Sequence, residues 1–186
     1  MNKSVKIMGP FAKVTFTHSL TQVIPGQYVL IDGKPFAIYD TSIDEFSIFV
    51  HKESYYVDND PKEISEPMGR GFTAALCKRA IVVAGGTGIG AVVPVIRSRN
   101  KYGLSTDVLI YTKGDAVSVR ADQATIGMCR NVIFWDTTVK GRPSDPLTPL
   151  VDKQPESCVF VAGPKSLVEA TKKVAGNFNF ICYTNF

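Results

Sequence analysis

The spacing of hydrophobic residues differs between the two halves of the chain. In the first half, short β-rich stretches are separated by turn signals such as Pro25-Gly26 and Asp32-Gly33, and no helical period of useful length is present. Partial alternation in Phe46–Val50 is typical of a strand with one buried face. We expect five strands and then a polar loop, Tyr55–Glu66, that ends in one last strand near Glu63–Pro67. The five strands are Val5–Ile7, Phe11–Thr17, Gln27–Ile31, Pro35–Tyr39 and Phe46–His51.

The second half alternates apolar runs with segments long enough for helices, a pattern that indicates a parallel, doubly wound sheet. The expected strands are Ile81–Ala84, Asp107–Tyr111, Val132–Trp135, Cys158–Ala162 and Phe178–Cys182. The expected helices are Ile89–Arg99, Val117–Met128, a short turn near Leu147–Val151, and Ser166–Ala175. The proline and glycine content of Gly141–Pro146 predicts a loop there.

These two patterns predict a β + α/β protein of two domains. Residues 1–75 are expected to form a small antiparallel β-barrel, because repeated short strands with little helix favour that architecture. Residues 76–186 are expected to form a doubly wound, five-stranded parallel sheet with flanking helices.

One stretch, Arg79–Arg97, combines a buried strand, a glycine turn and a helix. Gly85, Gly86, Thr87 and Gly88 form the turn, and glycine lets a phosphate approach the backbone N–H groups at the start of a helix. A tight turn without a ligand would need only one or two of these glycines. We therefore interpret the turn as a phosphate or dinucleotide site, although it is not a Walker loop.

Three further segments are candidate ligand contacts. Gly163 and Pro164 follow a second parallel strand, where ligands of open α/β sheets bind. Lys34–Tyr39 places a cation and aromatic residues after a turn, but an exposed lysine and a core phenylalanine would give the same pattern. Pro67–Phe72 has two glycines and Arg70 between the halves, and is either a linker turn or a ligand contact.

Composition and charge exclude several classes of protein. The chain has 186 residues with a formal net charge of +4, and its cations are scattered rather than interleaved with aromatic residues, so we expect no nucleic-acid partner. No apolar run reaches the roughly 20 residues of a membrane helix, and the N-terminus lacks the apolar region of a signal peptide. We expect a cytoplasmic protein. Its four cysteines form no C-x-x-C pair, so we expect reduced thiols and no metal site.

The order of four segments resembles the ferredoxin–NADP reductase superfamily of flavoprotein reductases over nearly the whole chain. These are Pro25–Tyr28, Pro67–Phe72, Ala84–Ile89 and Val161–Lys165. The resemblance is nearest to the branch with the electron-transfer subunit of dihydroorotate dehydrogenase B and the sulfhydrogenase gamma subunits. It implies FAD on the first domain (with FMN or no flavin as lesser alternatives), NAD(P)H on the second, and a redox protein partner or sister subunit.

The resemblance also implies roles for individual residues. Phe36 would face the flavin ring, Lys34 would neutralise a phosphate, and Ala37 and Ile38 of the same segment would also contact the cofactor. The flavin contacts would be Val50, His51, Lys52, Met68, Gly69, Arg70, Gly71, Phe72 and the terminal Phe186, and the dinucleotide contacts Gly85, Gly86, Thr87, Gly88, Gly163 and Pro164.

The first hypothesis is therefore a flavin-dependent NAD(P)H oxidoreductase or electron-transfer subunit. The second is a degenerate member that binds a nucleotide or docks a partner without redox turnover. Three departures from the family motivate it: Ala37 and Ala162 stand where relatives have polar residues, and the barrel is shorter, with no room between His51 and Pro67 for the usual helix. The third hypothesis is a purely structural subunit. The sequence does not decide between NAD and NADP: Lys113, Ser118 and Arg120, which follow the second parallel strand, would either serve a 2′-phosphate or simply be exposed.

Overall fold

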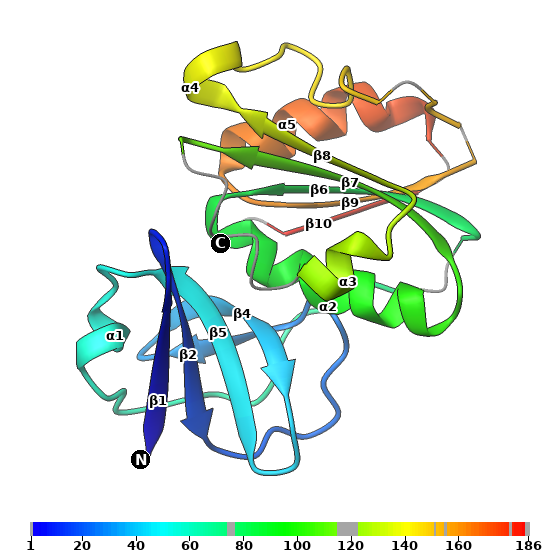
Figure 1. Cartoon of the computed structure of the whole chain (residues 1–186). Helices are drawn as coiled ribbons and strands as arrows, with labels where there is room; N and C mark the ends of the chain where they lie inside the picture. Colours follow the sequence, from blue (N-terminus) through cyan, green and yellow to red (C-terminus); the bar gives the residue numbers. More distant parts are fainter. Residues whose placement is uncertain are drawn as a thin grey trace.

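The computed structural model describes residues 2–73, 77–114, 123–150, 152–154, 156–178 and 180–184. Figure 1 shows two layered parts, an antiparallel sheet from the first half and a parallel sheet with helices from the second. The predicted boundary between residues 75 and 76 lies within residues 74–76, outside the described residues, and stays a prediction. No helix among the described residues is both long enough and apolar enough to span a membrane.

The first half is antiparallel, as predicted. Its five strands pair in the order β1-β2-β5-β4-β3. Among the described residues β1 and β3 are the two edges of this sheet and do not pair with each other, so the sheet does not close into the predicted barrel. The expected last strand is reduced to two isolated bridges, Ile64 to Ile31 and Met68 to Tyr28, which extend the β3 edge. The elements are β1 (Lys3–Met8), β2 (Phe11–Thr17), β3 (Tyr28–Ile31), β4 (Lys34–Thr41), β5 (Glu45–His51) and a helical turn, α1 (Tyr55–Asp58), inside the expected loop.

The second half is a five-stranded parallel sheet in the order β10-β9-β6-β7-β8, which confirms the predicted doubly wound fold. Its strands are β6 (Arg79–Gly85), β7 (Ser105–Thr112), β8 (Asn131–Asp136), β9 (Cys158–Ala162) and β10 (Phe180–Thr184). Its helices are η1 (Gly86–Gly88), α2 (Ile89–Lys101), α3 (Gln123–Gly127), α4 (Thr137–Lys140), α5 (Lys165–Val174) and η3 (Ala175–Asn177). The strand order reverses between β6 and β9.

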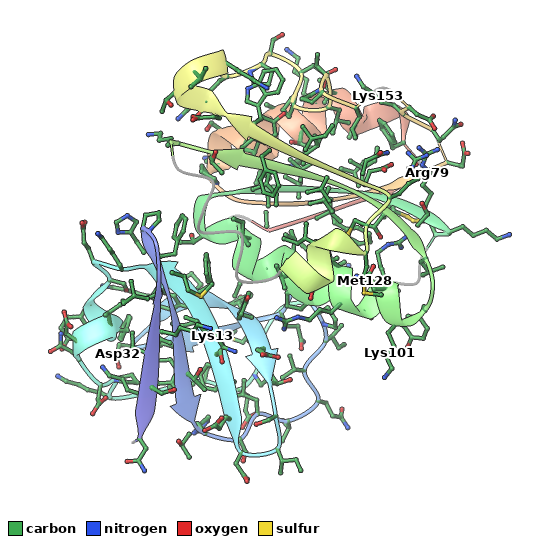
Figure 2. The ribbon with its side chains drawn as sticks, viewed as in Figure 1. Lys13, Asp32, Arg79, Lys101, Met128 and Lys153 are labelled. Carbon is green, nitrogen blue, oxygen red and sulfur yellow. A yellow bond between two sulfur atoms is a disulfide. The ribbon has the colours of Figure 1, made fainter. Side chains whose placement is uncertain are left out.

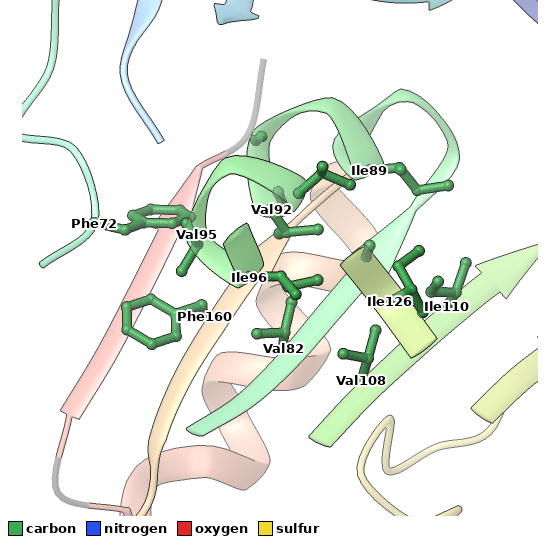
Figure 3. Close-up of a cluster of buried hydrophobic side chains, with 14 of the residues drawn as sticks. Phe72, Val82, Ile89, Val92, Val95, Ile96, Val108, Ile110, Ile126 and Phe160 are labelled. Carbon is green, nitrogen blue, oxygen red and sulfur yellow. The ribbon is translucent and has the colours of Figure 1, made fainter. Parts of the chain in front are cut away.

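Helices cover both faces of the parallel sheet. Alternate residues of each strand point to opposite faces, so Val82 packs under α2 while Ile81 packs on the α5 side. Figure 3 shows the α2 side, where Val92 and Ile96 meet Val82, with Phe160 beside them. In the predicted turn Leu147–Val151, residues 147–150 are non-helical and Val151 lies outside the described residues. Residues 117–122 of the expected Val117–Met128 helix also lie outside them.

Helix α2 also joins the two halves, because it lies between the two sheets (Figure 1). Phe49 and Tyr39 of the first sheet belong to the same buried cluster as α2. A Cβ on Gly90 would lie 2.8 Å from the Cβ of Phe49, so glycine is needed for this close packing. The strand Phe46–Val50 is consequently buried on both faces, where the sequence suggested one.

Ion pairs and hydrogen bonds connect the amino ends of the parallel strands. The carboxylate of Asp107 is fully buried and accepts hydrogen bonds from Arg130 Nη2 (2.6 Å) and Asn131 Nδ2 (2.8 Å). Arg79, at the start of β6 (Figure 2), lies 3.4 Å from Asp107 and 2.9 Å from Asp152. Burial raises the pKa of Asp107, whereas its hydrogen bonds oppose that rise. This network lies at the end of the sheet opposite to the glycine turns.

The expectation of reduced thiols is wrong for two of the cysteines. A disulfide joins Cys77, just before β6, to Cys158 at the start of β9, across 81 residues of sequence. Cys129 is a free thiol, and burial raises its pKa to about 11. The pairing leaves no mark in the sequence, because Cys77 and Cys158 meet only when β9 is placed beside β6.

We expect Cys158→Ser to lower the free energy of unfolding by about 2–4 kcal/mol, because the cross-link closes a long loop of the unfolded chain. Chemical denaturation without a reductant measures this loss, with Cys129→Ser as the matched control. Adding a reductant should remove the difference between wild type and Cys158→Ser. Free Cys77 and Cys158 thiols in oxidised, freshly purified protein would contradict the disulfide.

Candidate functional site

A cavity with a volume of about 760 Å³ lies between the two sheets. This volume is typical of a ligand or cofactor site. One wall comes from the first sheet, and the other from the carboxyl ends of the parallel strands. The first wall comprises Pro10, Phe11, Pro35, Phe36, Ala37, Phe49, Val50, His51 and Ser54; the second comprises Gly85, Gly86, Thr87, Gly88, Ile89, Tyr111, Thr112, Lys113, Thr137, Arg142, Pro143, Pro146, Gly163, Pro164, Ser166, Leu167 and Ala170.

The backbones approach very closely where the strand order reverses between β6 and β9. A Cβ on Gly88 would lie 2.2 Å from the carbonyl oxygen of Ala162, and one on Gly163 would lie 2.8 Å from that of Gly85. Real Cβ atoms do not tolerate such distances, so these glycines are required by packing. Gly88 therefore has a structural role that the sequence interpretation, which made it a pyrophosphate contact, did not anticipate.

Gly86 and Thr87 differ from these packing glycines, because they face open space. Gly86 has a φ of +55°, a Cβ added to it would have no atom within 4 Å, and Thr87 is exposed. Helix α2 begins directly after this turn, and α5 begins after Pro164 on the neighbouring strand. The first N–H groups of a helix have no intrahelical partners, so two sources of hydrogen-bond donors converge on this corner.

The wall formed by the first sheet is mainly apolar. Phe36 is half-buried, and its ring meets Tyr56 edge-on at 5.2 Å between centroids. The Phe11 ring packs against Phe49 at 5.1 Å and against His51 at 6.0 Å. This wall offers aromatic and aliphatic surface suited to a planar ring, with His51 and Ser54 as its polar side chains.

Ten of the residues predicted from the sequence line the cavity: Phe36, Ala37, Val50, His51, Gly85, Gly86, Thr87, Gly88, Gly163 and Pro164. The other predicted residues that the structure describes do not line it. Lys34 is exposed at the start of β4, Ile38 is buried in the core of the first sheet, and Lys52 is exposed beyond β5. Phe186 lies outside the described residues.

The segment Met68–Phe72, predicted to contact a flavin, packs against β3 and the parallel sheet. Met68 exchanges backbone hydrogen bonds with Tyr28, and the Gly69 carbonyl accepts one from Gln27 Nε2 at 2.8 Å. The Phe72 ring is buried 5.5 Å from that of Phe160, which anchors the segment to the parallel sheet. Remaining members of the segment, Arg70 and Gly71, also do not line the cavity.

Sequence reasoning missed the part of the wall beyond β7 and β8. Tyr111, Thr112, Thr137 and Arg142 line it, and the sequence indicates Lys113 only as a specificity residue. Segment 141–146 is a loop, as predicted, but nothing in its sequence places it at the cavity. A general rule for parallel sheets would have pointed to these residues, because the loops that follow the strands all lie at the same edge of the sheet, where ligands bind.

The charged side chains that line the cavity are of one sign. None of the described residues that line it is aspartate or glutamate, whereas Lys113 and Arg142 are cations. An anionic ligand is therefore favoured over a cationic one. The residues also fit a flavin together with a nicotinamide dinucleotide: the apolar wall suits a planar ring, and the glycine corner suits phosphates.

No protein-family model matches the chain. It is 27% identical over 173 residues to the "Probable dihydroorotate dehydrogenase B (NAD(+)), electron transfer subunit" of Methanopyrus kandleri, covering 85% of this chain and 66% of that protein. The chain thus spans slightly less than two thirds of the relative's length.

Solved structures of redox proteins share the fold. Phthalate dioxygenase reductase matches 99% of this chain and 65% of its own, with a TM-score of 0.75 and 20% identity. The FAD/NAD-binding domain of a nitric oxide dioxygenase from Vibrio cholerae matches 98% of this chain and 95% of its own, with a TM-score of 0.73 and 14% identity. These similarities establish a fold of the ferredoxin reductase type, as the motif order predicted.

The two kinds of glycine at the turn should respond differently to substitution. We expect Gly88→Val to lower the free energy of unfolding by about 3 kcal/mol or more, because the side chain collides with the Ala162 backbone. Gly86→Ala should cost only about 1–2 kcal/mol, from its left-handed backbone conformation. Urea denaturation without any ligand compares them, and wild-type stability of Gly88→Val would contradict the packing account.

Proposed function

We propose that the chain is the electron-transfer module of a flavin-dependent NAD(P)H oxidoreductase. It would pass electrons between a nicotinamide dinucleotide and a redox protein partner or sister subunit, with FAD as the flavin. The observation that carries the proposal is the single cavity that joins the apolar wall of Phe36 and Ala37 to the glycine corner of β6 and β9. The fold shared with reductases and the relative from Methanopyrus kandleri support it.

The redox chemistry would come from the flavin, whose ring can take up a hydride and give up electrons singly or as a pair. The chain's residues supply the geometry. Phe36, Ala37 and Val50 present the surface for the ring, while Gly86, Thr87 and the start of α5 present N–H donors for the dinucleotide phosphates. Pro10 and Phe11, at the turn between β1 and β2, form the rim on the first-sheet side.

The structure bears on two of the three departures that motivate a degenerate, redox-inactive member. Ala162 is fully buried and belongs to the hydrophobic cluster beneath α2, so a polar group there is not needed to complete the cavity wall. Ala37 does line the cavity and offers no side-chain donor, so a flavin ring would take its hydrogen bonds there from backbone groups.

The protein is proposed to work in the cytoplasm. Disulfides are uncommon in that compartment, so the state of Cys77 and Cys158 in protein isolated from its native cells also tests this assignment.

Reconstitution with FAD tests the proposed function. The full-length protein should show flavin absorbance bands after incubation with FAD, and anaerobic NADH or NADPH should bleach them with one nicotinamide oxidised per flavin. The protein would not be a flavin reductase if no flavin binds, or if neither nucleotide bleaches the bound flavin.

A cavity-filling variant locates the flavin. We expect Ala37→Leu to weaken FAD binding by about tenfold or more, because added side-chain volume takes up the apolar wall. ADP binding at the glycine corner should stay unchanged. Thr17→Leu, on an exposed strand end away from the cavity, is the matched control. Equal FAD affinities for Ala37→Leu and wild type, by fluorescence titration, would place the flavin elsewhere.

A further inference from the structure

We propose that the Cys77–Cys158 disulfide is a redox switch, which a dithiol opens by reduction and which controls how firmly the two halves of the chain are held together. This inference goes beyond the proposed function, because it concerns the amino ends of the parallel strands, at the end of the sheet opposite to the cavity. The chain passes from the first half to the second between Phe72 and Cys77, a connection here termed the crossing. The disulfide joins the far end of the crossing to β9.

The crossing is attached to β9 at two points. The Phe72 ring lies 5.5 Å from the ring of Phe160 (Figure 3), and Cys77 is bonded to Cys158, two residues earlier on the same strand. Residues i and i+2 of a strand point to the same face of the sheet. Both attachments therefore lie on the α2 side, within or against the buried cluster that contains α2. Reduction of the disulfide would remove the covalent one of the two.

Each end of the crossing makes further contacts. The Phe72 backbone N–H donates to the carbonyl of Pro25 in the first half. At the other end, Arg99 Nη1 donates to the carbonyl of Cys77 at 3.0 Å, and Arg99 Nη2 donates to that of Lys78 at 3.1 Å. Arg99 is fully buried near the end of α2, and burial lowers its pKa to about 10, so it stays charged at neutral pH. The disulfide thus holds the point where the crossing meets both β9 and α2.

The two sulfurs differ in their access to solvent. Cys158 is only 1% exposed, whereas Cys77 is half-buried. An incoming thiolate therefore attacks the sulfur of Cys77 and forms a mixed disulfide with it, while Cys158 leaves as a thiolate. The second thiol of the dithiol then attacks the mixed disulfide and releases Cys77. Two electrons pass to the protein, the reductant gains the disulfide bond, and its two thiol protons end on the sulfurs of Cys77 and Cys158.

The folded chain has room for the reduced state. Cys77 Sγ lies 2.9 Å from the carbonyl oxygen of Arg79, so the freed thiol has a hydrogen-bond acceptor. Cys158 lies in the buried hydrophobic cluster, an environment that suits a neutral thiol. The free thiol of Cys129 is a poor nucleophile, because burial raises its pKa to about 11. We therefore expect reduction to loosen the crossing while both sheets stay folded.

Limited proteolysis with trypsin tests the switch on the full-length protein without a cofactor. Lys78 is exposed, but the hydrogen bond from Arg99 to its carbonyl means that cleavage after Lys78 requires local opening. We expect dithiothreitol to speed this cleavage by about tenfold or more, because the cross-link no longer limits opening. Removal of dithiothreitol and addition of oxidised glutathione should restore the slow rate. Cleavage after Lys173, an exposed residue of α5, should not change.

Variants separate the disulfide from other effects of the reductant. Cys77→Ser/Cys158→Ser should be cleaved after Lys78 as fast as reduced wild type, with or without dithiothreitol. Cys129→Ser is the matched control and should behave as wild type in both states. An unchanged rate after Lys78 on reduction would overturn the switch, because the crossing then stays closed. Equal acceleration after Lys173 would also overturn it, because the whole protein then unfolds.

A second readout rests on the proposed function, because the two walls of the cavity come from the two halves. We expect FAD to dissociate at least about threefold faster from Cys77→Ser/Cys158→Ser than from oxidised wild type, since binding requires both walls in place. Flavin fluorescence after dilution measures both rates, and equal rates would contradict control of the halves by the disulfide. Failure of oxidised wild type to bind FAD would overturn the proposed function and leave the Lys78 test of the switch intact.

Discussion

The close approach of two backbones between β6 and β9 is the constraint on which the site depends. Gly88 lies against Ala162, and Gly163 against Gly85, at distances that exclude any side chain. This contact brings the beginnings of α2 and α5 to one corner, where the strand order reverses. An open parallel sheet gathers its ligands at such a corner because helix N-termini supply N–H donors and partial positive charge there. The packing requirement and the anion site are thus two consequences of one geometry.

Helix α2 connects this corner to the first sheet, against which it packs. Its beginning contributes to the glycine corner, and its flank is fixed to the other half by Arg97, which lies 3.1 Å from Asp40 and 5.0 Å from the ring centroid of Tyr39. Gly90 permits the contact with Phe49, a residue that itself lines the cavity. The apolar wall and the glycine corner are therefore positioned by the same helix. If a hydride donor and its acceptor bind on opposite walls, the two walls must keep a fixed position relative to each other, because hydride transfer requires the reacting atoms to be close and aligned.

The sequence predicted the parts of this site that depend on local backbone chemistry. The turn at Gly86, the second turn at Gly163 and the doubly wound order follow from glycine placement and from the alternation of strands and helices. The place of residues 141–146 at the cavity could not be predicted. Among their contacts is the hydrogen bond from the Tyr111 hydroxyl on β7 to the carbonyl of Pro146, which exists only in the folded chain. Met68–Phe72 matched a family motif, yet this chain uses its Phe72 for packing between the halves.

The most direct test of the anion site at the glycine corner is the response of backbone amides to ADP, measured by ¹H–¹⁵N correlation spectra of the full-length protein. We expect binding to shift the amide signals of Gly86 and Thr87 and that of Ser166 at the start of α5, while those of the exposed strand β1 stay in place. Saturable ADP binding that leaves the Gly86 and Thr87 amides unmoved would contradict a phosphate site at this corner.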